Sequence, residues 1–391
     1  MKKKILFLIE SFAGGGVEKV FIDLINNMDI SKYDITVMSI WDYGVRKKDL
    51  RKDVKYKSIF PNIRGISRVF HNFVEKSDGS LLYKLGIREK YDIEIAFIEG
   101  RATKIIGAST NPNSKKIAWV HIDLSQGHWT SRVFRESLQR EKECYKRFND
   151  IIFVSNSAKE GFKKLFGDDF DNLQVKYNPI IAEEVVKKAE EEVNDIEKPK
   201  DKMLLVTSGR LVSQKGYESL LEVCNKLNKD NIKYELWILG EGWARPKLEE
   251  LINKYNLSNV KLLGFKENPY KYISKGDLFV CSSKNEGFSL VIAEAMILGL
   301  PVISTNCSGP NELLNFGQFG YMVENNEEAL YEGLKEIINN DEKLKYYKKK
   351  SKERIDFFNY KNRISDIERL FNDDYQAENQ CYNTCIMWKN G

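Results

Sequence analysis

The sequence predicts an α/β protein with two facing domains, each built on a parallel, doubly wound sheet. Three observations predict this fold. The chain has 391 residues, which corresponds to two or three domains at roughly 100–200 residues each. Both halves alternate short apolar runs with patterns of helical spacing, as parallel sheets with crossover helices require. A strongly charged stretch separates the two halves.

The first half contains five short apolar runs that we interpret as buried strands. A glycine-rich turn at residues 10–16 follows the first run, and apolar residues at helical spacing come next. The expected strands are residues 5–9, 35–40, 93–98, 116–120 and 151–154. This half is expected to form one domain over residues 1–182.

Residues 183–202 contain 13 Lys, Asp or Glu residues, which is typical of a surface helix or linker. The alternation then restarts, and we expect a second domain over residues 203–356. Its clearest helix covers residues 289–298 and ends before Gly299 and Pro301. The expected strands are residues 204–208, 235–239, 260–263, 278–281 and 301–304. A last helix is expected within residues 357–372, followed by a polar tail, residues 373–391, that we expect to be flexible.

Composition excludes several classes of function. The net charge of +5 is mild, and no nucleic-acid-binding module is recognisable, so we expect no nucleic-acid partner. The six cysteines form no CxxC pair, which favours reduced thiols in a cytoplasmic protein. The apolar run that ends before Glu10 is too short for a signal peptide. No apolar stretch approaches the ~20 residues that span a bilayer.

The strongest functional motif is residues 286–294, which follow an apolar strand and run into a helix. Gly287, Phe288, Ser289 and Leu290 would present free backbone N–H groups at the helix N-terminus, where a phosphate binds. Glu286 precedes the helix, and Glu294 interrupts its apolar residues. A carboxylate accepts two hydrogen bonds, as a sugar or ribose diol requires, and a charge in an apolar helix needs a partner. The alternative is a helix with one acidic cap and one surface Glu.

The second motif opens the second domain directly after a strand. Gly209 and Arg210 are followed by Lys215 and Gly216. Two cations in a glycine-flanked loop at the carboxyl end of a strand suit a diphosphate. A turn with two solvated cations remains the alternative.

Two weaker features lie in the first domain. Gly14, Gly15 and Gly16 would let the backbone approach a ligand closely, although a plain tight turn fits equally well. His121 follows an expected strand at its carboxyl end, where open α/β sheets place ligands. The alternative for His121 is a structural histidine.

Together these motifs resemble the retaining glycosyltransferases of family 4, which have the GT-B fold with a cleft between two Rossmann-like domains and include many bacterial polysaccharide transferases. The resemblance covers roughly residues 4–370. The second-domain motifs are specific in combination, whereas those of the first domain are loose. The matching residues are Gly15 to Glu18, His121, Val154 to Ser157, Gly209, Arg210, Lys215, Gly216, Glu286 to Met296, Gly299 to Val302 and Gly309 to Glu312.

The resemblance implies a role for each residue. Arg210 and Lys215 would hold the donor diphosphate beside Gly209, and the amides of Ser289 and Leu290, next to Phe288, would bind a phosphate. Glu294 would bind the ribose hydroxyls. Glu286 and His121 would contact the transferred sugar, and Gly15 and Gly16 would let the diphosphate approach the first, acceptor-side domain. The last helix would cross back to that domain.

The resemblance implies neither metal nor cofactor, since the cations and the helix terminus could supply the positive charge. Asp169 and Asp171 have the spacing of a metal-binding DxD motif. They lie in an acidic turn, and we interpret them as surface residues.

The acceptor is expected to be a lipid-linked glycan. Residues 46–68 contain nine Lys or Arg and two Asp, and they merge into apolar residues at helical spacing up to residue 73. A basic amphipathic segment can lie on an anionic membrane, and a helix packed on the first domain is the alternative. We therefore expect a cytoplasmic protein with peripheral contact at the inner face of the membrane.

The expected reaction is retaining transfer of a hexose or N-acetylhexosamine from a nucleotide-diphosphate donor to a growing glycan of a surface polysaccharide. Uridine is the favoured base, on the resemblance of Gly309 to Glu312 to galactose and hexosamine transferases. Two alternatives remain. One is a sugar-nucleotide 2-epimerase of the same architecture, and the other is a non-catalytic subunit that binds sugar nucleotides.

Overall fold

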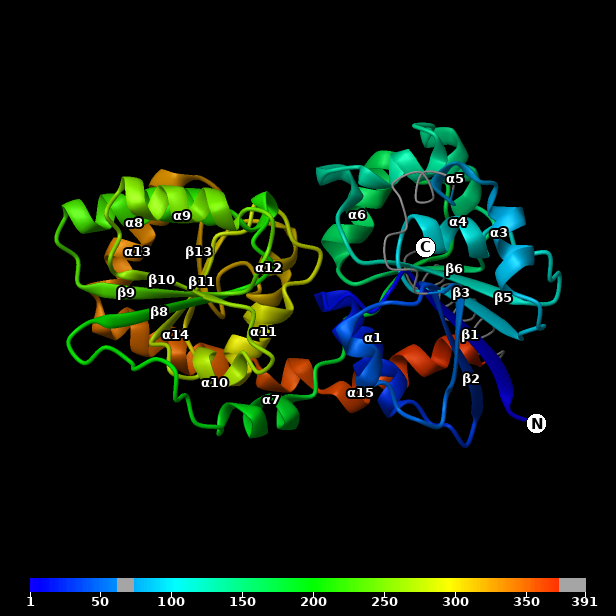
Figure 1. Ribbon diagram of the computed structural model, residues 1–391, viewed down its shortest axis with the longest axis horizontal. Coiled ribbons are helices and arrows are strands. Elements are labelled where there is room, and N and C mark those ends of the chain that lie inside the picture. The colour runs from blue at the N-terminus through cyan, green and yellow to red at the C-terminus, as the bar shows by residue number, and fades with distance from the viewer. Residues whose placement is uncertain (62–73, 373–391) are drawn as a thin grey trace, which may run out of the picture.

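A computed structural model describes residues 1–61 and 74–372 of the chain. Two α/β domains lie side by side and are joined by α7 (Ala182–Ala189) and the loop after it, while α15 (Tyr360–Glu368) runs back to the first domain (Figure 1). The predicted fold class is confirmed, since both sheets are entirely parallel.

The first domain has a seven-stranded sheet in the order β3-β2-β1-β4-β5-β6-β7. Its strands are β1 (Lys3–Ile9), β2 (Tyr33–Trp41), β3 (Lys55–Phe60), β4 (Ile93–Ala96), β5 (Lys115–Val120), β6 (Asp150–Phe153) and β7 (Leu173–Val175). Its α-helices are α1 (Gly16–Asn27), α3 (Gly79–Gly86), α4 (Arg101–Ile106), α5 (Leu138–Tyr145) and α6 (Asn156–Phe166).

Side chains of β1 alternate between two cores. Phe7 packs in the core that includes α1 and α15, whereas Leu6 and Leu8 pack under α3, α4, α5 and α6. Helices therefore cover both faces of the sheet (Figure 1). This explains why β1 reads as a continuous apolar run and not as an alternating one.

The second domain has a six-stranded sheet in the order β10-β9-β8-β11-β12-β13, the same winding on a smaller scale. Its strands are β8 (Met203–Ser208), β9 (Tyr234–Leu239), β10 (Val260–Gly264), β11 (Leu278–Cys281), β12 (Val302–Thr305) and β13 (Tyr321–Val323). Its α-helices are α8 (Tyr217–Lys229), α9 (Arg245–Lys254), α10 (Tyr270–Ile273), α11 (Leu290–Ile297), α12 (Ser308–Leu313), α13 (Glu327–Ile338) and α14 (Asp341–Glu353).

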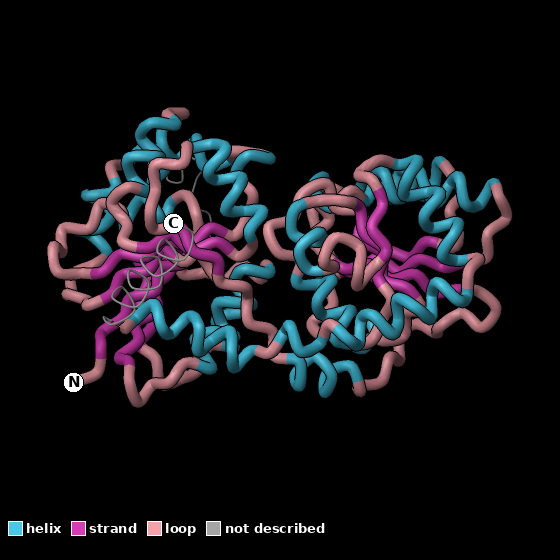
Figure 2. The backbone as a smooth tube through the Cα atoms, turned by 180° about the vertical axis from the view of Figure 1, so that it is seen from behind, coloured by secondary structure: helices cyan, strands magenta, loops and turns pink. Residues whose placement is uncertain are grey.

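The C-terminal segment ties the two domains together, as Figure 2 shows from behind. After α15, the short 3-10 helix η6 (Arg369–Phe371) places Phe371 against Phe7 and Tyr33 of the first sheet. The Lys115 ammonium donates to the carbonyl oxygen of Leu370 at 2.8 Å. The end of the second half of the chain is thus part of the first domain's core.

The basic segment at residues 46–73 is described only up to residue 61. This part contains most of the 3-10 helix η1 (Val45–Asp49) and the edge strand β3. Six of its seven basic side chains at positions 46–61 lie within ion-pair distance of a carboxylate. These are Arg46, Lys47, Lys48, Arg51, Lys55 and Lys57. The apolar residues predicted at helical spacing up to residue 73 lie outside the described residues, and so do Arg64 and Arg68. The predicted tail at 373–391 also lies outside them.

Candidate active site

The predicted site residues gather where the carboxyl ends of the two sheets face each other. The loops after β1 and β5 come from the first domain, and the loops after β8 and β11 come from the second. Parallel α/β sheets bind ligands at this edge.

Gly287 lies where the second domain packs tightly against the backbone of the first. A Cβ atom on Gly287 would lie 1.9 Å from the carbonyl oxygen of His121, so only glycine allows this contact. The amide of Gly309 donates to the carbonyl oxygen of Glu286 at 2.9 Å and fixes the same loop from the other side. The predicted loop at residues 286–289 therefore lies directly beside His121.

Lys215 and Glu286 form an ion pair at the end of the second sheet. Lys215 Nζ lies 2.5 Å from Glu286 Oε1, and Ser283 Oγ donates to the same oxygen at 2.8 Å. The adjoining Gly216 has a φ of +67°, and a Cβ there would lie 1.9 Å from the Ser282 carbonyl oxygen. Nearby carboxylate charge raises the pKa of Lys215 against the opposing effect of burial, so the side chain remains an ammonium.

The N-terminus of α11 lies beside this pair. Ser289 occupies the N-cap position but makes no side-chain capping bond, and its buried hydroxyl has no hydrogen-bond partner among the described residues. Unpaired helix amides and an unpartnered hydroxyl together suit an anion. From the first domain, a Cβ on Gly16 would lie 3.1 Å from Leu290 Cδ1. Phe288 packs against Tyr177 with ring centroids 6.2 Å apart.

Glu294 lies in the second turn of α11 and is 4% exposed. Its Oε1 accepts a hydrogen bond from the Tyr270 hydroxyl at 2.9 Å and lies 3.5 Å from Lys19 Nζ, on α1 of the other domain. Burial raises the pKa of Glu294, and the Lys19 charge opposes this effect. Tyr270 and Lys19, which both lie outside α11, thus supply the partners that a charge in an apolar helix requires.

His121 is held as a neutral ring. Its Nε2 lies 2.9 Å from the carbonyl oxygen of Phe97, which can only accept, so Nε2 carries the proton and Nδ1 keeps a lone pair. Burial lowers the pKa of His121 to about 4. Sequence reasoning missed its neighbour Glu99, whose Oε2 accepts from the His121 amide at 2.9 Å. Burial raises the pKa of Glu99 to about 7.

Arg210 is exposed, in the loop after β8. A Cβ on the preceding Gly209 would lie 3.1 Å from Lys215 Cε, so that loop also runs close to the ion pair. The Arg210 charge acts on Glu18, in the first turn of α1 next to Gly15: burial raises the pKa of Glu18, and the Arg210 charge lowers it. The diglycine turn is therefore within electrostatic reach of the predicted diphosphate site.

Glu312 was predicted only as part of a motif linked to the donor base. The structure places it at a contact between domains. Its carboxylate accepts from the backbone amide of Asn156 at 2.8 Å, at the N-terminus of α6, and from the Tyr177 hydroxyl. Beside it, Ser308 Oγ donates to Asp123 Oδ2 at 3.1 Å. A carboxylate at a helix N-terminus is favourable, but no local sequence pattern indicates a partner in another domain.

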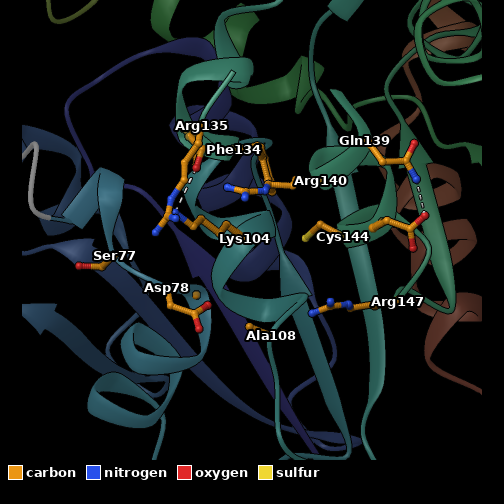
Figure 3. A pocket seen from close by; sticks show the side chains of 13 residues that line it. Ser77, Asp78, Lys104, Ala108, Phe134, Arg135, Gln139, Arg140, Cys144 and Arg147 are labelled. Atoms are coloured by element: carbon orange, nitrogen blue, oxygen red, sulfur yellow. Dashed lines mark hydrogen bonds between the residues drawn. The ribbon is translucent and has the colours of Figure 1, made fainter. Parts of the chain in front are cut away.

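A separate pocket of about 410 Å³ lies in the first domain between α3, α4 and α5 (Figure 3). Lys104, Arg135, Arg140 and Arg147 contribute to its lining, and Cys144 lies among them. It contains none of the predicted site residues.

Asp169, of the DxD spacing, pairs with Lys142 at 2.6 Å and with Lys146 at 2.9 Å. Among residues 1–61 and 74–372, no group of three or more His, Cys, Asp or Glu side chains could hold a metal ion. Over the same residues, no helix combines the length and apolar character that crossing a bilayer requires.

Comparisons with known proteins agree on one class. The profile of the family described as "Glycosyl transferases group 1" matches residues 188–354. An uncharacterised glycosyltransferase of Methanocaldococcus jannaschii is 31% identical over 320 residues, which is 73% of this chain and 78% of that protein. The N-acetylgalactosamine-N,N'-diacetylbacillosaminyl-diphospho-undecaprenol 4-alpha-N-acetylgalactosaminyltransferase of Campylobacter jejuni is 38% identical over 217 residues, 55% of this chain and 57% of that protein.

Among solved structures, HepE of Anabaena in complex with UDP and glucose superposes with a TM-score of 0.73 at 18% identity, covering 94% of this chain and 99% of that one. At this identity the similarity concerns the fold, which is the GT-B arrangement of two facing Rossmann-like domains.

Proposed function

Because the chain belongs to the group 1 glycosyl transferases, we propose that it moves a hexose or an N-acetylhexosamine from a nucleotide-diphosphate donor to a growing, lipid-linked glycan of a surface polysaccharide. The donor base is uridine, the anomeric configuration is retained, and no metal takes part. The protein acts in the cytoplasm, with peripheral contact at the inner face of the membrane.

One observation carries this proposal: the Lys215–Glu286 ion pair and the N-terminus of α11 lie directly across from His121 and the diglycine turn. Positive charge and helix amides on one side suit a diphosphate. A neutral imidazole and a carboxylate near the same point suit sugar hydroxyls.

The charge distribution supports loss of diphosphate without metal. The Lys215 ammonium has three N–H donors and gives one to Glu286, so others are available for phosphate oxygens. Arg210 and the α11 N-terminus add positive potential, and preorganised charge of this kind stabilises a leaving group as it departs. Attack from the face on which the diphosphate leaves would give retention without a covalent nucleophile.

His121 contributes as an acceptor. With Nε2–H directed at Phe97, the ring offers Nδ1 to a sugar hydroxyl. Its low pKa keeps the ring neutral at physiological pH, so it neither competes with nor repels the cations around the diphosphate.

The comparisons support the finer parts of the proposal. The Campylobacter relative is named for an acceptor linked to diphospho-undecaprenol, and HepE was solved with UDP and glucose. Both facts favour a uridine donor and a lipid-linked acceptor here.

A thermal-shift panel of UDP-, GDP- and ADP-sugars tests the donor. A ligand at 100 times its Kd should stabilise the fold by about 2.7 kcal/mol, and UDP-sugars are expected to give the largest shift. Product analysis of the bound sugar nucleotide, with and without a lipid-diphosphate acceptor, tests the reaction. An altered sugar nucleotide without acceptor would indicate an epimerase. Binding with neither donor hydrolysis nor transfer would indicate a non-catalytic subunit.

A further inference from the structure

Lys19 joins the two domains at a partly buried position. It is the fourth residue of α1, and its side chain is 16% exposed. Its Nζ donates to Asp23 Oδ2 at 2.9 Å and lies 3.5 Å from Glu294 Oε1. The two carboxylates raise the pKa of Lys19 against the opposing effect of burial, so the side chain is a fixed positive charge.

Glu294 depends on this charge more than on any other group around it. The groups that face its carboxylate are Tyr270 from α10, and Lys19 and Asp23 from α1. Burial and the negative charge of Asp23 both favour the protonated acid, whereas Lys19 and the Tyr270 hydroxyl favour the carboxylate. Lys19 is the only cation among them.

The free side of the Glu294 carboxylate points to a ligand role. Oε1 is occupied by Tyr270 and Lys19, and Oε2 accepts no hydrogen bond from the residues that the structure describes. An ionised carboxylate oxygen can accept two further hydrogen bonds, as a ribose diol would donate, whereas a protonated carboxyl group would offer fewer acceptor sites.

We propose that Lys19 is a positioning residue for the donor: from the first domain, it keeps Glu294 ionised and oriented to bind the ribose of a nucleoside diphosphate held by the second domain. This inference rests on the proposed function and on the ribose-binding role that the family resemblance implies for Glu294.

The surroundings of α1 support the same role. Gly16 lies against Leu290 at the start of α11, and the Arg210 charge acts on Glu18. The start of α1 thus contacts α11, the helix expected to bind the donor, through Gly16 and Lys19. Ribose binding by Glu294 would then require the closed arrangement of the domains, which couples donor affinity to closure of the cleft.

Removal of Lys19 should make donor binding depend on pH. In Lys19→Met, Asp23 and Glu294 would be two neighbouring buried carboxylates without a cation, and the pKa of Glu294 would rise further. Affinity would be retained at high pH and lost as the pH falls through the raised pKa. Each unit of pKa lowers the ionised fraction about tenfold at pH values well below that pKa.

The test is calorimetric titration of the intact protein with UDP between pH 6 and pH 9. Wild type is the reference at each pH, because the terminal phosphate and the base of UDP themselves titrate near the ends of this range. Relative to wild type, Lys19→Met should bind more weakly at the low end and approach wild type at the high end, with up to about a tenfold change in affinity per pH unit below the raised pKa of Glu294. Lys19→Arg, which restores the charge, should bind like wild type. The matched control is Lys48→Met, which removes an exposed ion pair between the domains, to Glu267, and should leave binding unchanged.

A double-mutant cycle distinguishes a positioning role of Lys19 towards Glu294 from a general effect of Lys19 on the structure. If Lys19 acts through Glu294, Lys19→Met should add no further loss to Glu294→Gln. Equal losses in both backgrounds, or wild-type affinity at every pH in Lys19→Met, would overturn the inference and leave the proposed donor intact. A folded wild-type protein that does not bind UDP would instead overturn the proposed uridine donor, and the inference with it.

Discussion

The Nζ atom of Lys215 lies 2.5 Å from Oε1 of Glu286, and the two side chains come from loops at the carboxyl ends of neighbouring parallel strands, β8 and β11. The pair keeps a cation and a carboxylate in one partly buried position. The Lys215 ammonium can face a diphosphate while the Glu286 carboxylate faces the sugar attached to it.

Lys215→Ala should remove part of the charge that stabilises the leaving diphosphate. Loss of one preorganised electrostatic donor typically lowers kcat by ~10²–10³-fold. Steady-state kinetics with the preferred UDP-sugar measures the effect. Lys226→Ala, which removes an exposed pair with Glu328 in the same domain, is the control and should have near-wild-type rates. Folded Lys215→Ala enzyme with unchanged kcat/KM would refute the diphosphate role.

Glu294→Gln and Glu286→Gln should separate in their kinetic effects. The ribose does not change during the reaction, so Glu294→Gln should mainly raise the KM for the donor. The sugar does change, so Glu286→Gln should mainly lower kcat. A donor concentration series for each variant distinguishes the two patterns. The same balance of KM and kcat effects in both variants would remove the distinction.

Activity should persist in excess chelator. Lys215, Arg210 and the α11 N-terminus already supply positive charge at the expected leaving group, so a divalent ion is not required. The measurement is transfer rate in EDTA, with added Mg²⁺ or Mn²⁺ as the comparison. Inactivation that either metal reverses would contradict this prediction.

Glu99 and His121 should have opposite effects on stability as the pH falls. The pKa of His121 is about 4 in the folded state against 6.5 when unfolded. Because the unfolded chain takes up this proton first, His121 lowers the stability of the fold as the pH falls from 6.5 to 4. The pKa of Glu99 is about 7 against 4.5, so its protonated form stabilises more as the pH falls from 7 to 4.5. The two effects should nearly cancel in wild type between pH 4.5 and 6.5.

Substitution of either Glu99 or His121 should reveal the pH dependence of stability that the other residue contributes. As the pH falls, the free energy of unfolding of Glu99→Gln should decrease relative to wild type, and that of His121→Asn should increase. Each change should amount to up to about 3 kcal/mol. Urea denaturation at pH 5 and pH 7 measures both changes. His121→Asn keeps the backbone amide that donates to Glu99, so it isolates the ring. Parallel pH profiles in the two variants would show that neither group titrates as the structure implies.

Association with anionic vesicles should depend on residues 46–73. Six of the seven basic side chains at positions 46–61 lie near carboxylates and Lys52 has no ion pair among the described residues, while Arg64 and Arg68 are the other basic residues of the segment. Each exposed cation near such a surface contributes about 1 kcal/mol, and salt weakens the attraction.

Vesicle flotation at low and high salt tests this prediction. Arg64→Gln/Arg68→Gln should float less than wild type at low salt. Lys226→Gln/Lys247→Gln makes the same change of net charge in the second domain and should float like wild type. If wild type stays in solution with anionic lipid at low salt, the segment is not a membrane contact.

Several features could be predicted from sequence because their signals are local. Strands buried on both faces, such as β1 and β8, appear as short continuous apolar runs. Glu294 is conspicuous as a charge within an apolar helix, and the glycines around residues 209–216 and 287 mark places where chains pass closely. Edge strands β3 and β13 were not predicted, because β3 is half-buried and basic and β13 has only three residues.

By itself, the sequence determined two parallel α/β domains, the loop-helix at residues 286–294 and the cations that precede it. Only the tertiary structure decided which groups meet between the domains: Lys19 with Glu294, Glu312 with Asn156, and Gly287 with His121. The physical reason is the distance along the chain over which each property is determined. Strand and helix patterns follow from neighbouring residues along the chain, whereas the charge on a buried carboxylate depends on how the two domains pack against each other.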